Sequence, residues 1–160
     1  MSRPLGPKPP GSTAQSSKVA RWLGRVARVL VASPDYLDAF GRPEQPADLA
    51  EHEAIVTLTA RGPDHLWRLT RGEREYTVGV RGRLRSTTLL ANFRGALAGL
   101  GIALVPRWLA REALADERLE LVLPHFEAPT IDLFAVYRAR DRGSPVLTAL
   151  VTSMRRALSR

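Results

Sequence analysis

Three hydroxyl residues, Ser86, Thr87 and Thr88, stand directly before a stretch with helical periodicity and are the best candidates for ligand contact. Backbone N–H groups at a helix N-terminus favour a carboxylate or another anion, and neighbouring hydroxyls add hydrogen-bond donors. The same residue types also serve as plain helix caps, so capping stays open as the alternative. Ser33, which precedes Pro34, has the same two interpretations.

The segment after these hydroxyls predicts a helix, a glycine stop and a buried strand. Gly99 and Gly101 bracket the expected end of the helix, and residues 102–105 predict a short strand covered on both faces and ending at Pro106. A helix leading into a buried strand indicates a parallel α/β sheet, whose strand ends gather at a ligand cleft. Pro106 is expected to border that cleft. The apolar residues at helical spacing are Leu89, Leu90, Phe93, Ala96, Leu97 and Leu100.

The rest of the chain alternates strand and helix patterns. The pair serine–proline occurs at Ser33-Pro34 and at Ser144-Pro145, and each pair predicts the start of a helix. The last helix carries an apolar stripe: Leu147, Leu150, Val151, Met154 and Leu158. Strands are expected at 26–32, 54–58, 67–69, 76–80, 119–123 and 131–137, and further helices at 34–40 and 108–114. The strands at 67–69 and 76–80 are expected to pair antiparallel around Arg71-Gly72-Glu73.

Length and composition fit one globular domain. The chain has 160 residues, of which 44% are hydrophobic, and it has no cysteine. Disulfides, thiolate metal sites and thiol catalysis are therefore excluded. Since no signal peptide and no apolar run long enough to cross a bilayer are recognisable, we expect a cytoplasmic protein without membrane contact.

The formal net charge of +8 raises the question of a polyanionic partner. The arginines are dispersed over expected loops and helix ends, and no aromatic residues alternate with them as a base-stacking surface would require. This dispersal favours a solvated basic surface, and a nucleic-acid-associated module is the alternative. The dispersed residues include Arg61, Arg68, Arg71, Arg74, Arg111 and Arg118.

Candidate catalytic and cofactor motifs are weak. His52, His65 and His125 stand far apart without metal-ligand spacing, which predicts surface histidines and no metal site. Ser33 is not part of a G-x-S-x-G elbow, and Asp64-His65 has no evident nucleophile beside it. The glycines match neither phosphate-binding fingerprint. We therefore expect no enzyme activity and no cofactor.

Three segments in one order carry a family resemblance. ALAGLGIALVP (residues 96–106) closely resembles the AGxGIAxLP segment in the effector-binding domain of LysR-type transcriptional regulators. VLVASPDYL (residues 29–37) is similar to the VLVASPxYL strand of that family. The G-x-P and P-x-DL-x-x-H segments that follow in the family appear here at residues 41–43 and 46–52.

The resemblance implies an α/β fold of the periplasmic-binding-protein-like type II, with the second lobe nearly complete and the first lobe partial. Residues 26–123 would form the second lobe, residues 130–158 would return a strand and a helix to the first lobe, and residues 1–17 would be a flexible lead before a domain spanning 18–160. The resemblance also implies a truncated chain without the family's helix-turn-helix.

The function implied by the resemblance is that of an effector-binding fragment sensing a small, anionic metabolite. Ser33, Ser86, Thr87, Thr88 and Pro106 would contact this effector. A homodimer, or a heterodimer with a full-length regulator, is the protein partner expected from the family, and no direct DNA binding is expected from this chain alone. An inactive remnant of a regulator is the remaining alternative.

Overall fold

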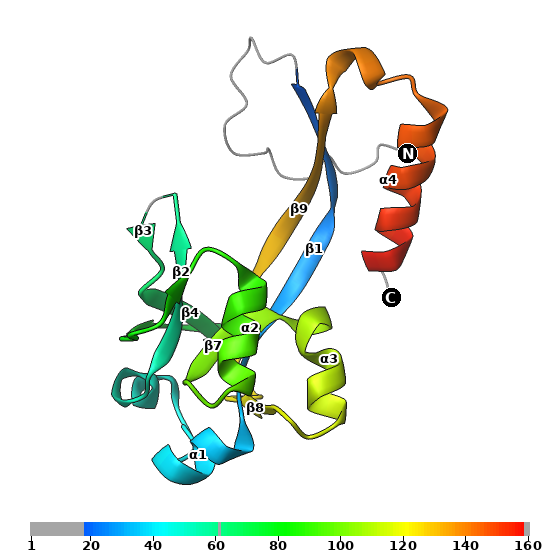
Figure 1. The fold of residues 1–160 in the computed structure, drawn as a ribbon. Helices are drawn as coiled ribbons and strands as arrows, with labels where there is room; N and C mark the ends of the chain where they lie inside the picture. The colour runs from blue at the N-terminus through cyan, green and yellow to red at the C-terminus, as the bar shows by residue number, and fades with distance from the viewer. Residues whose placement is uncertain (1–17, 61, 159–160) are drawn as a thin grey trace. The chain divides into compact units, whose positions relative to one another are not determined.

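The computed structural model describes residues 18–60 and 62–158 and divides the chain into two compact units (Figure 1). The first unit contains the described residues up to Val26 and those from Thr130 onward, and the second is Ala27–Pro129. The chain passes from one unit to the other within β1 (Lys18–Ala32) and returns within β9 (Ala128–Arg138). The predicted lead, residues 1–17, lies outside the described residues.

The second unit is built on a mixed sheet in the order β3-β2-β7-β1-β8, with β6 beside β2. β2 pairs in parallel with both β6 and β7, whereas β1 runs antiparallel to β7 and β8. The expected parallel sheet is therefore found only for β2, β6 and β7, and the antiparallel pairing of β1 makes the sheet mixed. The bounds are β2 Ala54–Thr59, β3 Gly62–Pro63, β6 Arg85–Ser86, β7 Ile102–Pro106 and β8 Glu120–Val122.

Helices α2 (Leu89–Leu97) and α3 (Arg107–Ala115) pack on one face of this sheet. Successive residues of a strand point to opposite faces, so Ala103 and Val105 of β7 meet the helices. Small side chains such as Ala96 and Ala110 let the helices approach the strands closely. The buried cluster on this face contains Val31, Ile55, Ala96, Ala103, Val105, Ala110, Ala113 and Leu119.

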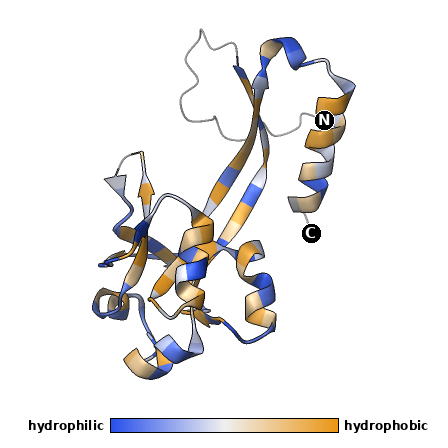
Figure 2. Ribbon diagram, in the orientation of Figure 1, coloured by the Kyte–Doolittle hydropathy of each residue, from blue (hydrophilic) through white to orange (hydrophobic). Residues whose placement is uncertain are grey.

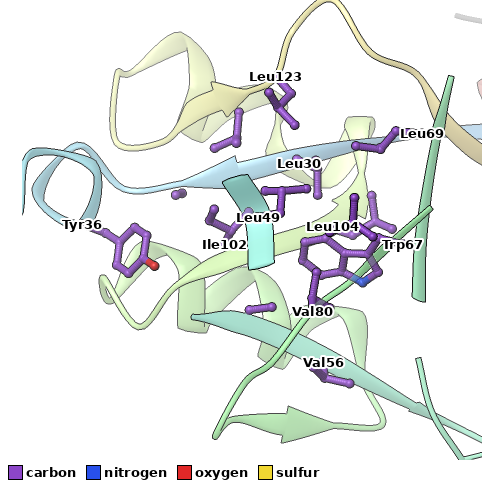
Figure 3. Packing of buried hydrophobic residues seen from close by; sticks show 14 of the residues in the cluster. Leu30, Tyr36, Leu49, Val56, Trp67, Leu69, Val80, Ile102, Leu104 and Leu123 are labelled. Carbon is purple, nitrogen blue, oxygen red and sulfur yellow. The ribbon is translucent and has the colours of Figure 1, made fainter. Parts of the chain in front are cut away.

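The opposite face of the sheet is covered by a β-hairpin and two short helices. Strands β4 (Leu66–Arg71) and β5 (Arg74–Gly79) pair antiparallel, as predicted. α1 (Pro34–Phe40) and the 3-10 helix η1 (Pro46–Glu51) complete this cover. The labelled members of the resulting cluster are Leu30, Tyr36, Leu49, Val56, Trp67, Leu69, Val80, Ile102, Leu104 and Leu123 (Figure 3). Because both faces are covered, every residue of β7 is buried.

The buried face of α2 differs from the predicted stripe. Leu90 and Leu100 are more than half exposed, whereas Asn92 and Gly95 are buried. A Cβ at position 95 would lie 2.9 Å from side-chain atoms of both Ile55 and Leu84, so the helix approaches the sheet through a residue without a side chain. Apolar periodicity alone does not detect a contact made by glycine.

The first unit has fewer layers. Within it, β1 pairs with β9, and the chain continues through η2 (Ala139–Asp141) into α4 (Pro145–Leu158). Trp22 Nε1 donates to Asp132 Oδ1 at 3.0 Å, and Arg155 Nη2 donates to the carbonyl of Trp22 at 2.9 Å. Hydrophobic residues run along both β9 and α4 (Figure 2). Of the predicted α4 stripe, Val151 is buried but Leu150 is 55% exposed.

Candidate functional site

The start of α2 is fixed by hydroxyl groups. Thr88 is the N-cap, and its Oγ1 accepts a hydrogen bond from the amide of Ala91 at 3.3 Å. Ser86 Oγ accepts from the amide of Thr88 at 3.0 Å. Thr87 is exposed. The predicted capping by a threonine is therefore confirmed for Thr88, and the effector contact of these residues stays a prediction.

Asn92 fastens the first turn of α2 to the end of β2. Its Nδ2 donates to Thr57 Oγ1 at 2.8 Å, and Thr57 is the parallel partner of Ser86. Asn92 is fully buried, and its Oδ1 makes no hydrogen bond to any described residue. This hydrogen bond connects α2, which begins at the Thr88 cap, to the end of β2. The apolar periodicity of the helix did not predict it.

Pro106 lies at the same edge of the sheet as these hydroxyls. β7 ends at Pro106 and runs parallel to β2, and β2 runs parallel to β6, which ends at Ser86. Parallel strands bring their carboxyl ends to one edge. The structure therefore brings Ser86, Thr88 and Pro106 to a common edge.

Ser33 is not brought to that edge. It follows β1, which runs antiparallel to β7, so it lies at the opposite end of the strands. It is buried, and its Oγ accepts from the amide of Tyr36 at 3.2 Å as the cap of α1. A Cβ at Gly99, beyond the C-terminal end of α2, would lie 3.5 Å from the same oxygen. Ser33 and Thr88 therefore lie at opposite ends of α2.

A pocket of about 610 Å³ opens on the hairpin side of the sheet. The amide of Asp64 donates to the carbonyl of Thr57 at 2.9 Å, which connects the pocket wall to the strand end that also contacts α2. Leu104 and the buried Trp67, neighbours in Figure 3, supply apolar surface. The pocket is lined by Arg28, Pro63, Asp64, His65, Leu66, Trp67, Arg68, Leu104 and Pro129.

The guanidinium group of Arg28 lies in the wall of this pocket and is held by a hydrogen bond. Its Nε donates to the carbonyl of Pro129 at 2.7 Å. Burial lowers the pKa of the Arg28 guanidinium, and the negative charge of Asp64 acts in the opposite direction. A guanidinium nevertheless keeps its proton at neutral pH, and its five N–H donors form a planar fork that matches a carboxylate. The lining contains two guanidinium groups, Arg28 and Arg68, and one carboxylate, Asp64, so its formal charge is positive.

The analysis of the sequence missed Arg28, although a signal for it exists. The residue stands among Val26, Ala27, Val29 and Leu30, and strand alternation puts it on the same face as Leu30. A charge on the buried face of an apolar strand needs a polar partner or a ligand.

The histidines do not gather into one site. Tyr36 Oη and His52 Nδ1 lie 3.2 Å apart, His65 lines the pocket, and His125 is exposed. No group of three or more metal-ligating side chains occurs among residues 18–60 and 62–158. In the same residues, no helix is both long and apolar enough to cross a membrane.

Comparison with known families decides the class of the chain. A family model described as the LysR substrate binding domain matches residues 6–159. The chain belongs to this family. The expected α/β fold of the periplasmic-binding-protein type is confirmed by this match together with the structural neighbours.

Similar proteins are transcriptional regulators of the helix-turn-helix type. The chain is 36% identical over 131 residues to the probable regulator SinR of Salmonella typhimurium, covering 80% of this chain and 41% of SinR. It is 39% identical over 136 residues to the uncharacterised regulator YhjC of Escherichia coli, covering 81% of this chain and 44% of YhjC. The chain thus spans less than half the length of the curated relatives it matches.

Solved structures agree with this assignment. Full-length AphB, a virulence activator of Vibrio cholerae, is 29% identical with a TM-score of 0.69, covering 89% of this chain and 48% of AphB. The regulatory domain of CrgA from Neisseria meningitidis has a TM-score of 0.75 at 22% identity, covering 91% of this chain and 72% of that domain, and shows the fold alone. The matched relatives SinR and TtdR are named as a probable transcriptional regulator and a transcriptional activator.

Proposed function

We propose that this chain is the ligand-sensing part of a LysR-type regulator and that it binds a small anionic metabolite in the cytoplasm. Family membership supports a regulatory, ligand-sensing role. The observation that carries the anionic character is Arg28, a partly buried guanidinium in the wall of a pocket of about 610 Å³. A volume of this size suits a small organic molecule.

In this proposal, a carboxylate of the effector accepts hydrogen bonds from Arg28. Its Nε already donates to Pro129, and the fork has further N–H groups. Trp67 and Leu104 would contact the apolar part of the effector. Asp64 and His65 would hydrogen-bond a hydroxyl or amide, because both line the same pocket.

The edge formed by Ser86, Thr87, Thr88 and Pro106 would complete the effector contacts. The first amides of α2 favour negative charge, and Asp64 links this edge to the pocket through Thr57. Ser33 is not part of the proposal, since it caps α1 at the other end of the strands.

Signalling would follow from a shift between conformations. We assign residues 26–123 to the second lobe and residues 130–158 to the returning part of the first lobe, as the family resemblance implies. An effector that binds one arrangement more tightly than the other favours it by that difference in affinity. This shift would be passed to the DNA-binding part of a regulator.

A thermal-shift series tests the proposal. Acetate, succinate and benzoate are each compared with their neutral amides, acetamide, succinamide and benzamide. At least one carboxylate should raise the melting temperature while its amide does not, because ligand that binds only the folded state stabilises it. Arg28→Gln should abolish the shift, and the exposed Arg111→Gln, the matched loss of charge on α3, should preserve it.

Two results would contradict the proposal. Equal stabilisation by each carboxylate and its amide would remove the role of the charge. Salt-sensitive binding of duplex DNA, lost equally on removal of Arg28 or Arg111, would instead favour the nucleic-acid module suggested by the net charge.

A further inference from the structure

One wall of the pocket of about 610 Å³ is an edge of β4, and a proline keeps this edge open. Thr70 of β4 and Glu127 form an isolated antiparallel bridge with two backbone hydrogen bonds of 2.8 Å. Alternation along the strands makes Arg68 and Pro129 the next hydrogen-bonding pair of this ladder. Proline has no N–H to donate, and the carbonyl of Pro129 accepts from Arg28 Nε at 2.7 Å. The ladder therefore stops beside the pocket that Arg68 and Pro129 both line.

The backbone of Arg68 consequently presents a donor and an acceptor at this wall. The N–H and C=O of Thr70 point away from β5, so those of Arg68, two residues earlier, point the same way. Among the residues that the structure describes, no backbone hydrogen bond crosses this edge at Arg68. A carboxylate alone can satisfy only the N–H, whereas a molecule that also carries an amine can satisfy both groups.

The charged side chains of the pocket have both signs. Burial lowers the pKa of the Arg28 guanidinium, and the negative charge of Asp64 raises it, so the two groups act on each other. The ion pairs formed within residues 18–60 and 62–158 nevertheless do not include Asp64. Two groups that served only to neutralise each other would gain more from contact, because Coulomb attraction falls with distance. The separation suits a ligand that carries charges of both signs.

The number of charges narrows the class of ligand further. The guanidinium groups of Arg28 and of the exposed Arg68 stand against the single carboxylate of Asp64, so one positive charge remains when His65 is neutral. A molecule with two carboxylates and one ammonium complements this set group by group and carries one net negative charge. A dicarboxylate without an amine would leave Asp64 facing only negative charge, and a charge without a partner in a partly enclosed site is costly.

We infer that the effector is an acidic α-amino acid, whose ammonium pairs with Asp64 while its carboxylates pair with Arg28 and Arg68. The inference rests on the proposed function, which supplies the carboxylate on Arg28. Opposite Asp64, an ammonium hydrogen-bonds the carboxylate as a hydroxyl or amide would, and it neutralises the charge in addition. The backbone carbonyl of Arg68 offers the ammonium a second acceptor at the same wall.

Two matched series of ligands test this inference in isothermal titration calorimetry. L-aspartate, L-malate and succinate share one carbon skeleton and differ only in an ammonium, a hydroxyl or a hydrogen at one carbon. L-glutamate, L-2-hydroxyglutarate and glutarate form the same series on a longer skeleton. In at least one series, the dissociation constant of the amino acid should be about tenfold or more below those of both partners, because only the amino acid neutralises Asp64.

Substitution of Asp64 separates recognition of the ammonium from a structural role. Asp64→Asn should weaken binding of the amino acid about tenfold, and it should leave the matched dicarboxylate bound equally or more tightly, since a repelling carboxylate has been removed. A merely structural role would weaken both ligands. Glu112→Gln makes the same charge change at an exposed position of α3 and should leave both affinities nearly unchanged.

The outcomes distinguish failure of this inference from failure of the proposed function. If succinate or malate binds as tightly as aspartate, and glutarate or 2-hydroxyglutarate as tightly as glutamate, each losing affinity in Arg28→Gln, the amino acid is refuted and the anionic effector stands. Equal weakening of both ligands by Asp64→Asn would also refute the amino acid. Absence of binding in both series refutes it too, and the proposed function falls with it only if the carboxylates of the thermal-shift series also fail.

Discussion

The two units of this chain bury their apolar residues to different extents. In the second unit, β7 lies between a helical layer and a hairpin layer, and all of its residues are buried. In the first unit, β9 and α4 leave Val136, Val146 and Leu150 more than half exposed. The difference shows that burial depends on the number of layers around a segment and not on its hydrophobicity alone.

This contrast has an energetic counterpart. Two buried clusters on opposite faces of one sheet should give the second unit most of the stability of the chain, since hydrophobic stabilisation scales with the apolar area removed from water. The first unit should open at lower free energy. Equivalent substitutions made in each unit can therefore test whether the second unit contributes more to stability than the first.

The largest effect is expected at Gly101. Its φ of +146° disfavours any other residue, and an added Cβ would overlap the carbonyl oxygen of Glu53, which accepts from the amide of Ile102. Gly101→Ala should lower the free energy of unfolding by about 3 kcal/mol or more in urea denaturation. Gly143→Ala in the first unit is the control, because nothing lies within 4 Å of its added Cβ. Equal losses at both positions would contradict the contrast.

Leucine truncation gives the next largest difference. Leu69 of the hairpin strand β4 is 1% exposed, whereas Leu150 of α4 is 55% exposed. Leu69→Ala should cost about 2–5 kcal/mol of unfolding free energy, and Leu150→Ala about 0.5 kcal/mol or less. Chemical denaturation followed by Trp fluorescence measures both.

The cap of α2 should have a moderate effect. Thr88→Ala removes the hydroxyl that accepts from the amide of Ala91 and should cost about 1 kcal/mol. The adjacent Thr87→Ala is the matched control, because Thr87 is not the capping residue. Thermal unfolding separates the two variants, and a larger loss for Thr87 would mean that the cap is wrongly assigned.

The smallest effect is expected for the pH dependence of stability at Asp48. Backbone amides of Gln45 and Glu44 donate to Asp48 Oδ2 at 3.0 and 2.9 Å and lower the pKa of this carboxyl below its ordinary value. A lowered folded-state pKa contributes stability above the unfolded pKa of about 3.9, and this stability is lost as the pH falls through the folded pKa. Asp48→Asn should therefore melt slightly below the wild type at pH 7, and the difference should vanish in strong acid.

Much of the architecture could be predicted from the sequence. The Ser33-Pro34 cap, the hairpin around Gly72 and the buried strand after Gly101 all appear where local signals placed them. These signals are local because turns, caps and alternation depend on residues a few positions apart. Boundaries shifted where pairing extends an element, as in β1, which begins at Lys18 and not at Val26.

The candidate site was less predictable, because it depends on strand direction. Ser33 follows β1 and Ser86 is the last residue of β6, and both stand shortly before a helix, so they look equivalent in the sequence. The antiparallel direction of β1 separates them, and the direction of pairing is not encoded by either segment alone. Arg28 could have been found from alternation, and Asn92 from its polar character on an apolar helix face. The contact between Asn92 and Thr57, 35 residues apart, could not.

The discontinuity of the first unit has a consequence for biosynthesis. Its second half begins at Thr130, after all of Ala27–Pro129 has been translated. Domains generally fold as units while the ribosome is still elongating the chain. All of the second unit therefore precedes β9 in the order of synthesis, and β1 is made long before the strand with which it pairs in the first unit.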